Sequence, residues 1–522
     1  VFLQGDGAGK FTRRLTPFGP DAEAHLDLVA VTPVDVDGDN NPDVLLWSAA
    51  GGLRVFRSAG NGNHGLRLAL TGLREVPPPG FDGKPIRTNA DAVGCWVRIH
   101  AGPLRTATET TTFSAGLGQS RIPIHFGLGK ADAAEAVRIR WPDWVIQAEL
   151  NQAAGLVTVS ELDRRPSSCP VLFTWDGERF VYVTDFLGAG SMGEGSADGS
   201  TRPPRAEESV KVEANQFVPR AGKYVLKVAE PMDEVMYLDR LRLDVIDHPA
   251  DASVFPDERF ATSDPQPTQE RLYFRDSERV FAAKATTHRG RDVTATLRDR
   301  DGRHVEDFAR RTWLGFAEDH HVELDFGPAL KSLPAGRKVY LVLAGWVDYP
   351  YPESIYAATQ AGVPMVSPVM EQQQPDGSWK LLGEVGFPAG LTRVMTRDVT
   401  GWIDPDGGPV RLRTNLQVYW DHLFLAPVTD SDSTARELPV TRATMEHRGF
   451  VQEYSPNGKL PIAYDYDRLE PVAVTRWKGK FTRTGDVTEL LTATDDRHVI
   501  CGPGDEVTVE FDATALPPVR EG

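Results

Sequence analysis

The stretch DVDGDNNPD, residues 35–43, places oxygen-bearing side chains on alternate positions just before the apolar run VLLW. Carboxylates this close repel one another, so a positive charge is expected among them. Ca²⁺ takes about six to eight oxygen ligands in irregular geometry, whereas Mg²⁺ requires strict octahedral geometry. We therefore expect a calcium site formed by the side chains of Asp35, Asp37, Asp39 and Asp43 and the backbone carbonyl of Asn41. The alternative is a solvated acidic turn without an ion.

The loop contains Asn40 at a position where such loops commonly use Gly to reach a left-handed backbone conformation. Asn is the next most tolerant residue in that conformation. A site whose ligands all come from the protein leaves no open coordination position for chemistry. Calcium is therefore expected to stabilise the loop and not to catalyse a reaction.

Two later stretches concentrate aromatic residues, LAGWVDYPYPESIYAATQAG (343–362) and LRTNLQVYWDHLFLAP (412–427). Exposed rings stack on the C–H faces of sugars, while nearby carboxylates accept hydrogen bonds from hydroxyl groups. The candidate ligand-binding residues are Trp346, Tyr349, Tyr351, Trp420 and Asp421. The alternative is that these rings pack in the core.

A carbohydrate-active hydrolase is a second hypothesis, with Asp348, Glu353, Asp421 and His422 as acid–base candidates. No GxSxG or HExxH motif supports nucleophilic or zinc chemistry. His320 and His321 are adjacent in a predicted strand and face opposite ways, so they do not form one metal site. The acidic turns DRDG (299–302) and DPDGG (404–408) are interpreted as hairpin turns.

Composition excludes several classes of partner. The 522 residues include 57 basic and 74 acidic ones, for a formal charge of −17, without a Lys/Arg-rich run. Nucleic acid and anionic membranes both require clustered positive charge, so neither is an expected partner. No stretch approaches the ~20 apolar residues of a membrane helix. Cys95, Cys169 and Cys501 are too few and too far apart for a disulfide framework, and buried thiols are favoured over one bridge.

Short segments with period-2 hydrophobicity predict an all-β protein. HVELDF (321–326) and EVTVEF (506–511) alternate, and KVYLVLAGW (338–346) is nearly continuous, as in a strand buried on both faces. WDGERF (175–180) predicts an Asp-Gly hairpin. KADAAEAV (130–137) is expected to form a turn or two of helix.

The N-terminal residues contain a weak repeat: VFLQGDGAGKF from Val1 is similar to VFRSAGNGNHG from Val55. With the acidic loop between them, residues 1–63 resemble the FG-GAP/VCBS repeat of β-propellers. The resemblance implies that the family's calcium ligands correspond to the five residues named for the acidic loop. The sequence starts without Met in what reads as the middle of a repeat, so we expect a processed chain or part of a longer protein.

The run HFGLG (125–129) and the strand ending in Trp141-Pro142 resemble the hallmark of the ASPIC/UnbV domain, which typically follows FG-GAP repeats. Cys95-Trp96 and PDWVIQ depart from the usual pattern and affect local packing. His125 is interpreted as a structural histidine because no partner ligand stands at metal-binding spacing. The resemblance implies a secreted or periplasmic, calcium-binding protein with an adhesion or matrix role and no known catalysis.

These observations predict an all-β chain made of a partial propeller repeat followed by antiparallel β-sandwich-like domains. The expected divisions are 1–65 (incomplete propeller repeat), 66–162 (ASPIC/UnbV), 163–270 (β-rich module), 271–440 (β-sandwich, galactose-binding-like) and 441–522 (C-terminal β-rich segment). The expected function is calcium-stabilised binding or adhesion to a glycan or an extracellular protein. The alternatives are the hydrolase and a structural subunit of a large extracellular assembly.

Overall fold

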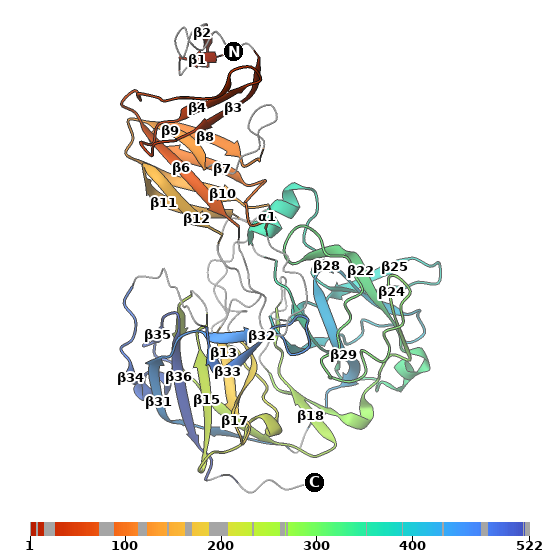
Figure 1. Cartoon of the computed structure of the whole chain (residues 1–522). Helices are drawn as coiled ribbons and strands as arrows, with labels where there is room; N and C mark the ends of the chain where they lie inside the picture. Colours follow the sequence, from red (N-terminus) through yellow and green to blue (C-terminus); the bar gives the residue numbers. More distant parts are fainter. Residues whose placement is uncertain are drawn as a thin grey trace. The chain divides into compact units, whose positions relative to one another are not determined.

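The computed structural model describes residues 2–6, 9–14, 27–72, 88–112, 123–142, 146–161, 170–186, 207–231, 234–260, 267, 270–350, 352–388, 390–430, 433–470, 479–514 and 516. The chain divides into two compact units (Figure 1). Unit 1 comprises Val1–Val76 and Pro85–Asp163, and unit 2 comprises Pro77–Lys84 and Arg164–Gly522. The described residues of both units are almost entirely strands, which confirms the predicted all-β class.

Unit 1 contains a two-layered β-sandwich. One layer has the order β11 (Ile146–Ala153), β10 (Ala133–Arg140), β7 (Trp96–Ala101), β8 (Leu104–Glu109), and the other has β12 (Gly155–Ser160), β6 (His64–Thr71), β9 (Ile124–Gly129). Alternate residues such as Val97, Ile99, Val137 and Ile139 are fully buried between the layers. Trp141 joins this core and its indole N–H donates to Gln147 Oε1 at 3.0 Å, so a buried polar group is satisfied.

The helix predicted for residues 130–137 is wrong, because Ala133–Arg140 forms the strand β10. That strand pairs with β11 on one side and β7 on the other, so it is central in its sheet. Its apolar residues bury one face of a sheet, and this packing overrides the helix propensity of alanine.

Before this sandwich, unit 1 has two small antiparallel sheets. The first pairs β1 (Phe2–Gly5) with β2 (Phe11–Arg14), and the second has the order β3 (Leu28–Val34), β4 (Asp43–Ser48), β5 (Gly52–Phe56). The acidic loop connects β3 to β4, whose facing end residues are Val34 and Asp43. The apolar run VLLW that follows the loop lies within β4.

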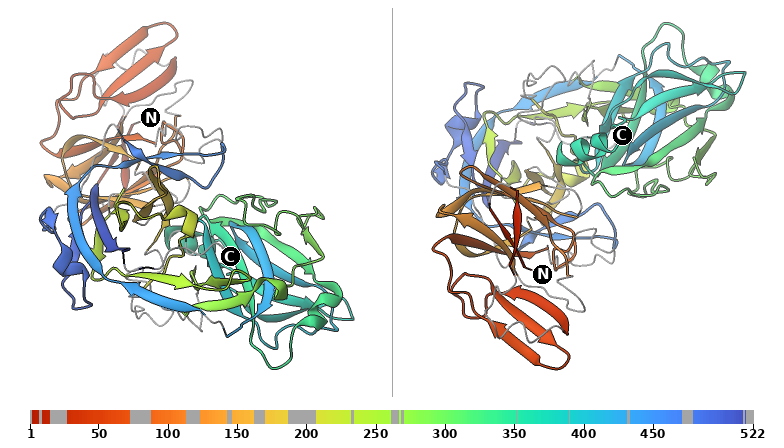
Figure 2. Two further views of the ribbon diagram at one scale, coloured as in Figure 1. Left: turned by 90° about the horizontal axis from the view of Figure 1, so that it is seen from below. Right: turned by 90° about the horizontal axis from the view of Figure 1, so that it is seen from above.

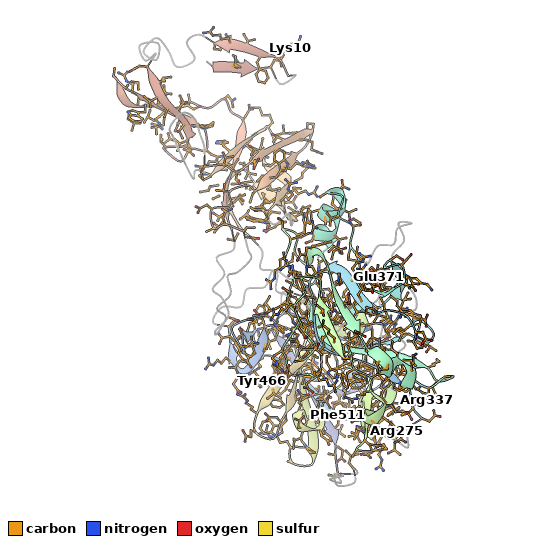
Figure 3. All side chains as sticks on the ribbon, turned by 90° about the vertical axis from the view of Figure 1, so that its right-hand side faces the viewer. Lys10, Arg275, Arg337, Glu371, Tyr466 and Phe511 are labelled. Carbon is orange, nitrogen blue, oxygen red and sulfur yellow. The ribbon has the colours of Figure 1, made fainter. Side chains whose placement is uncertain are left out.

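Unit 2 begins and ends in the same sheet. Its order is β14 (Phe180–Asp185), β13 (Val171–Trp175), β15 (Lys223–Ala229), β36 (Asp505–Asp512), β31 (Val440–His447), β34 (Gly485–Asp486). Segments 163–270 and 441–522, which we predicted as separate modules, therefore contribute strands to one layer (Figures 1 and 2). Phe511, labelled in Figure 3, is fully buried in the core beneath this sheet.

Short strand pairs complete this part of unit 2. They are β16 (Met236–Leu238) with β35 (Val499–Cys501), β17 (Leu243–Asp247) with β30 (Thr434–Leu438), and β32 (Val451–Tyr454) with β33 (Ala463–Leu469). The predicted hairpin at 175–180 is confirmed, since β13 and β14 pair across a turn in which Asp176 accepts two backbone N–H bonds. Cys501 and, in unit 1, Cys95 are fully buried, whereas Cys169 lies outside the described residues.

The rest of unit 2 is a second sandwich. A five-stranded sheet has the order β21 (Lys284–Thr287), β22 (Phe316–Asp325), β28 (Val410–Leu416), β24 (Val369–Gln373), β25 (Trp379–Glu384), and faces a sheet of β27 (Arg393–Asp398), β23 (Val339–Val347), β29 (Val418–Pro427). Two pairs flank them, β18 (Ala252–Phe255) with β20 (Leu272–Arg275), and β19 (Arg259–Phe260) with β26 (Phe387–Pro388).

The strand β23 is buried on both faces, as its nearly continuous apolar sequence predicted. Leu341 and Leu343 face the core between the two sheets, whereas Val342 and Ala344 belong to another apolar cluster on the opposite face. The sequence analysis missed the helix α1 (Pro352–Gln360), which lies in the aromatic stretch 343–362. In the described ranges, the remaining helical turns are 3₁₀ segments: η3 (Ala214–Gln216), η4 (Asp276–Glu278), η5 (Gly327–Ser332) and η6 (Thr488–Leu491).

Candidate functional site

The acidic loop takes a tight conformation that relies on two left-handed residues. Gly38 has φ of 80° and Asn40 has φ of 70°, so the predicted left-handed conformation of Asn40 is confirmed. The Asn40 side chain fixes this turn by donating to the Gly65 carbonyl at 2.5 Å and accepting from Arg67 Nε at 2.9 Å. The loop is thereby anchored to β6 of the neighbouring sandwich.

Three of the predicted calcium ligands converge in this loop. Each of Asp35, Asp37 and Asp39 places a carboxylate oxygen within 4.8 Å of an oxygen from the other two. The Asp35 carboxylate accepts backbone N–H bonds from Gly38 at 2.7 Å and Asn40 at 2.9 Å, which fold the chain around it. Three clustered carboxylates are a donor set that suits a hard cation.

Two arginines lie against the same carboxylates. Arg67 Nη1 is 2.7 Å from Asp35 Oδ2, and Arg57 forms an ion pair with Asp37. Burial raises the pKa of Asp35, but the backbone N–H donors and Arg67 outweigh it, so the pKa lies below its usual value. Asp35 is therefore ionised at neutral pH, and its two oxygens are bonded to the loop backbone and to Arg67.

The other two predicted ligands have different positions. Asp43 is buried, and its two oxygens accept the backbone N–H groups of Val36 at 3.0 Å and Ser58 at 2.7 Å. Its carboxylate is not part of the converging group, and it closes the base of the loop. The backbone N–H of Asn41 donates to Asp39 Oδ1 at 2.8 Å, which orients that carboxylate.

His125 lies on β9, half-buried, directly opposite Arg67 in the β6 ladder. Burial and the Arg67 charge lower its pKa, while Asp35 opposes the shift. A Cβ at Gly65 would come within 2.6 Å of His125 Nε2, so any larger residue there would have to displace the imidazole. These contacts agree with the interpretation of His125 as a structural histidine.

The aromatic residues proposed to bind a ligand are mostly core residues. Trp346 is 1% exposed and Trp420 is 3% exposed, and Trp346 stacks on Tyr419 with ring centroids 3.9 Å apart. Trp346 and Trp420 therefore fit the alternative, packing in the core. Strand period alone does not show that other segments cover both faces of their sheet. Tyr349 is partly buried against Phe387, with ring centroids 6.3 Å apart. Tyr351 lies outside the described residues.

Asp421 is buried and bonded to the turn 299–302. Its carboxylate oxygens accept the backbone N–H groups of Asp301 at 3.3 Å and Gly302 at 3.2 Å. Burial raises the pKa of Asp421 to about 6, against the effect of these two donors. The turn therefore packs on Asp421, and no ligand is needed to explain this carboxylate.

Two of the hydrolase candidates, Asp421 and His422, face opposite sides of β29. His422, next to Asp421 on β29, contacts Phe281 and Phe424, with ring centroids 5.7 and 5.2 Å away. Since adjacent strand residues face opposite sides, Asp421 and His422 do not act on one substrate atom. Asp348 is buried, and the side chain of Glu353 lies outside the described residues.

Sequence reasoning missed a buried charge cluster in unit 2. The Arg393 guanidinium, 1% exposed, has Nη2 at 3.1 Å from Glu208 Oε1 and 3.5 Å from Asp185 Oδ1. Glu258 is buried nearby and accepts the backbone N–H of Val394 at 2.9 Å. No local sequence motif predicts this cluster, because its residues come from distant parts of the chain.

It also missed a group with mixed nitrogen and oxygen donors. Asp239, Asp496 and His498 bring one donor atom each within 4.8 Å of one another. The ladder of β16 and β35 pairs Leu238 with Val499, and this register sets Asp239 beside His498. The signal in the sequence was the run DDRH just before a strand, which we did not single out.

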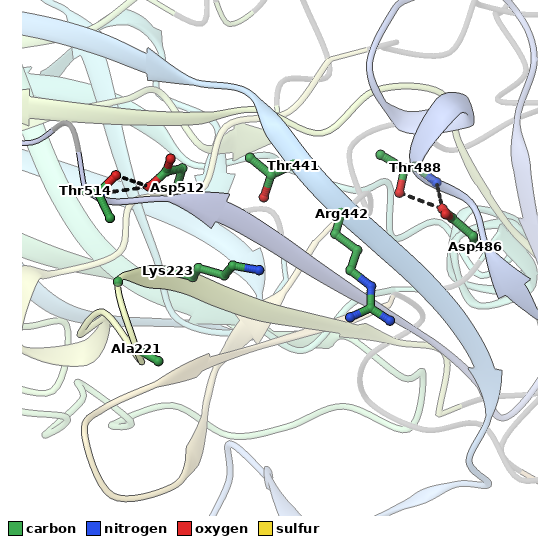
Figure 4. A pocket seen from close by; sticks show the side chains of 9 residues that line it. Ala221, Lys223, Thr441, Arg442, Asp486, Thr488, Asp512 and Thr514 are labelled. Carbon is green, nitrogen blue, oxygen red and sulfur yellow. Dashed lines mark hydrogen bonds between the residues drawn. The ribbon is translucent and has the colours of Figure 1, made fainter.

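A groove of about 660 Å³ lies along the six-stranded sheet of unit 2 (Figure 4). Its two carboxylates are already bonded within their own turns, Asp486 to Thr488 and Asp512 to Thr514. Its cations, Lys223 and Arg442, both approach Glu510. The polar groups of this groove are therefore satisfied by the protein.

Within the part of the chain that the structure describes, no helix has the length and apolar character needed to span a membrane. No curated protein and no solved structure matches the chain. One protein-family model does match, and it covers the HFGLG run, the strand β10 and Trp141-Pro142 of the unit 1 sandwich. Residues 84–163 match the family described as ASPIC and UnbV, which confirms the resemblance for that domain.

Proposed function

We propose that this protein is a calcium-stabilised binding protein, secreted or periplasmic, which holds a carbohydrate or protein ligand in an adhesive role. The observation that carries the proposal is the convergence of Asp35, Asp37 and Asp39, with carboxylate oxygens within 4.8 Å of one another. The resemblance of residues 1–63 to an FG-GAP/VCBS repeat supports calcium as the ion. The ASPIC/UnbV match in the following residues supports the same reading, because this domain typically follows such repeats.

The charges around the loop leave room for a cation. Three carboxylates face two guanidinium groups, those of Arg57 and Arg67, which leaves one negative charge uncompensated. Bound Ca²⁺ would supply positive charge where the oxygens lie closest. Asp35, Asp37 and Asp39 would hold it, while Asp43 keeps the loop closed through Val36 and Ser58.

Unit 2 supports binding more than hydrolysis. Residues 271–440 supply most strands of a two-sheet sandwich, an architecture compatible with the galactose-binding-like module that we propose for them. The raised pKa of Asp421 would suit a general acid, but both of its oxygens accept backbone N–H bonds from the turn that covers it. These bonds give the Asp421 carboxylate a structural role, which is to hold the turn 299–302 against β29.

The test is thermal unfolding of the whole chain with added Ca²⁺ and with a chelator. An ion present at about 100 times its Kd stabilises the folded state by about 2.7 kcal/mol, so chelation is expected to lower the melting temperature of unit 1. Asp37→Ala should remove most of that difference. Asp376→Ala is the matched control, since Asp376 is an exposed turn carboxylate bonded to Ser378, and it should leave the difference intact. Identical melting curves with and without chelator would contradict the proposal.

A further inference from the structure

Unit 2 contains a cavity of about 470 Å³ over the second face of the sheet formed by β27, β23 and β29. Its floor is apolar and consists mainly of Val342, Ala344 and Val394, which belong to a buried cluster. Its walls come from the segment before η3, from β18, and from the loops around residues 279–281 and 298–300. A cavity of this size suits a small ligand, since ligand pockets are commonly about 300–1,000 Å³.

The lining of this cavity reverses the charge balance of the chain. Lys211, Arg279, Arg298 and Arg300 line it, together with two carboxylates, those of Glu213 and Asp299. The whole chain, by contrast, has a formal charge of −17. Cations gathered at a concave site raise the local concentration of anions, so this surface favours a ligand of negative charge.

Aromatic rings hold three of these cations in place. The Arg298 guanidinium lies 4.3 Å from the centroid of the Phe281 ring, and Lys211 Nζ lies 4.6 Å from that of Phe255. The Arg279 guanidinium lies 4.7 Å from the Phe424 centroid, and its Nη2 donates to Asp276 Oδ1 at 2.5 Å and to Ser253 Oγ at 2.6 Å. Side chains held this way lose less conformational entropy when a ligand binds.

The carboxylates at the rim are placed to organise the cations. Glu213 Oε1 is 2.9 Å from Lys211 Nζ and 3.7 Å from Arg300 Nη1. It therefore draws both side chains to one edge of the cavity. Its remaining lone pairs, like those of Asp299, can accept hydrogen bonds from hydroxyl groups.

Two buried nitrogen atoms at the cavity lack a hydrogen-bond partner among the described residues, Arg279 Nε and His422 Nδ1. Both residues line the cavity. Burial and the Arg279 charge lower the pKa of His422 to about 4, so its imidazole is neutral near pH 7. A buried polar atom without a partner costs free energy, so the described residues do not fully satisfy the polar groups beside this cavity.

We propose that this cavity binds a polyhydroxylated organic anion, a sugar that carries a carboxylate or sulfate group. The four cations recognise the charged group, and Glu213 and Asp299 accept hydrogen bonds from hydroxyl groups. The apolar floor fits the C–H face of a sugar ring. A simple inorganic anion would make no hydrogen bonds to the carboxylates of Glu213 and Asp299 and no contact with the apolar floor. The inference rests on the binding role proposed above, but not on calcium.

The experiment is calorimetric titration of the whole chain with four probes. They are digalacturonate, a sulfated disaccharide, the neutral disaccharide lactose and a short Glu-rich peptide. Binding of either acidic sugar without binding of lactose supports the proposal, and the stronger of the two identifies the charged group. The affinity should fall as salt is raised.

Arg298→Gln and Arg300→Gln are suitable variants because both side chains are exposed at the rim. Each should weaken acidic-sugar binding by about tenfold, the effect of about 1.4 kcal/mol. Arg468→Gln removes an exposed arginine on β33, paired with Asp465, and should change affinity by less than about twofold. It controls for the loss of one positive charge.

Equal binding of lactose and the acidic sugars, binding of the peptide alone, or no binding of any sugar would overturn the proposal. So would acidic-sugar binding that neither variant weakens. Repeating the titration with a chelator separates the two proposals, because the cavity residues all belong to unit 2 and the acidic loop to unit 1. Sugar binding that survives chelation while melting is calcium-independent would refute the calcium site and leave this one standing.

Discussion

Unit 1 and unit 2 gather acidic side chains in opposite ways. In unit 1, Asp35, Asp37 and Asp39 come from alternate positions of one short loop near the surface. In unit 2, the carboxylate of Asp185 is buried and accepts the backbone N–H of Leu391, 206 residues further along the chain. The carboxylates of a loop near the surface can be neutralised by a cation that comes from solution and returns to it. Buried carboxylates must be neutralised by a cationic side chain of the protein. The first arrangement suits an ion that binds reversibly, and the second suits a fixed structural role.

The largest effect is expected from removing the cation of the buried cluster. Arg393→Met should destabilise unit 2 by about 3–5 kcal/mol, because it leaves the carboxylates of Asp185 and Glu208 buried without their guanidinium partner. Urea unfolding measures this change. Arg275→Met is the control: that arginine is exposed (Figure 3), pairs with Asp251 at 3.0 Å, and should contribute less than about 1 kcal/mol. Similar losses of unfolding free energy in Arg393→Met and Arg275→Met would show that the buried arginine contributes no more to stability than the exposed one.

The difference between the two regions also explains what the sequence could predict. The alternation of acidic residues along a single loop made the acidic cluster predictable, and period-2 patterns located strands such as β22 and β36. The Arg393 cluster had no such signal, because contacts between distant segments create it. The same reason accounts for Trp346 and Trp420, whose burial depends on the segments that cover their sheet.

Burial in unit 2 should also make stability depend on pH. Burial lowers the pKa of His320 to about 4, against the hydrogen bond to the Leu416 carbonyl. The unfolded chain therefore binds the proton more tightly, and stability is lost as pH falls below about 6.5. Between pH 7 and 4.5 this histidine should account for a loss of about 2 kcal/mol.

Comparing urea unfolding of the wild-type chain and His320→Gln at these two pH values isolates that contribution. His304 and His422 have pKa values lowered to about 4 and act in the same direction, while Asp421, raised to about 6, acts in the opposite one. The variant should lose less stability than the wild type on acidification. His248→Gln, at an exposed position, should lose as much as the wild type. An unchanged pH dependence in His320→Gln would show that this imidazole is protonated as readily as in the unfolded chain.

The smallest effect concerns the exposed ion pair of the acidic loop. The Arg57 side chain is 67% exposed and pairs with Asp37, so it competes with a cation for that carboxylate. Arg57→Gln should therefore strengthen Ca²⁺ binding, by about two- to fivefold, because exposed pairs contribute little. Calorimetric titration with Ca²⁺ measures this gain. Arg54→Gln is the control, because Arg54 lies on β5, which ends just before Arg57, and its loss removes equal charge at a residue that forms no ion pair with the described loop carboxylates. Weaker calcium binding by Arg57→Gln would mean that this arginine orients Asp37 for the ion. The acidic loop would then require an arginine beside its carboxylates, as the buried cluster of unit 2 requires Arg393.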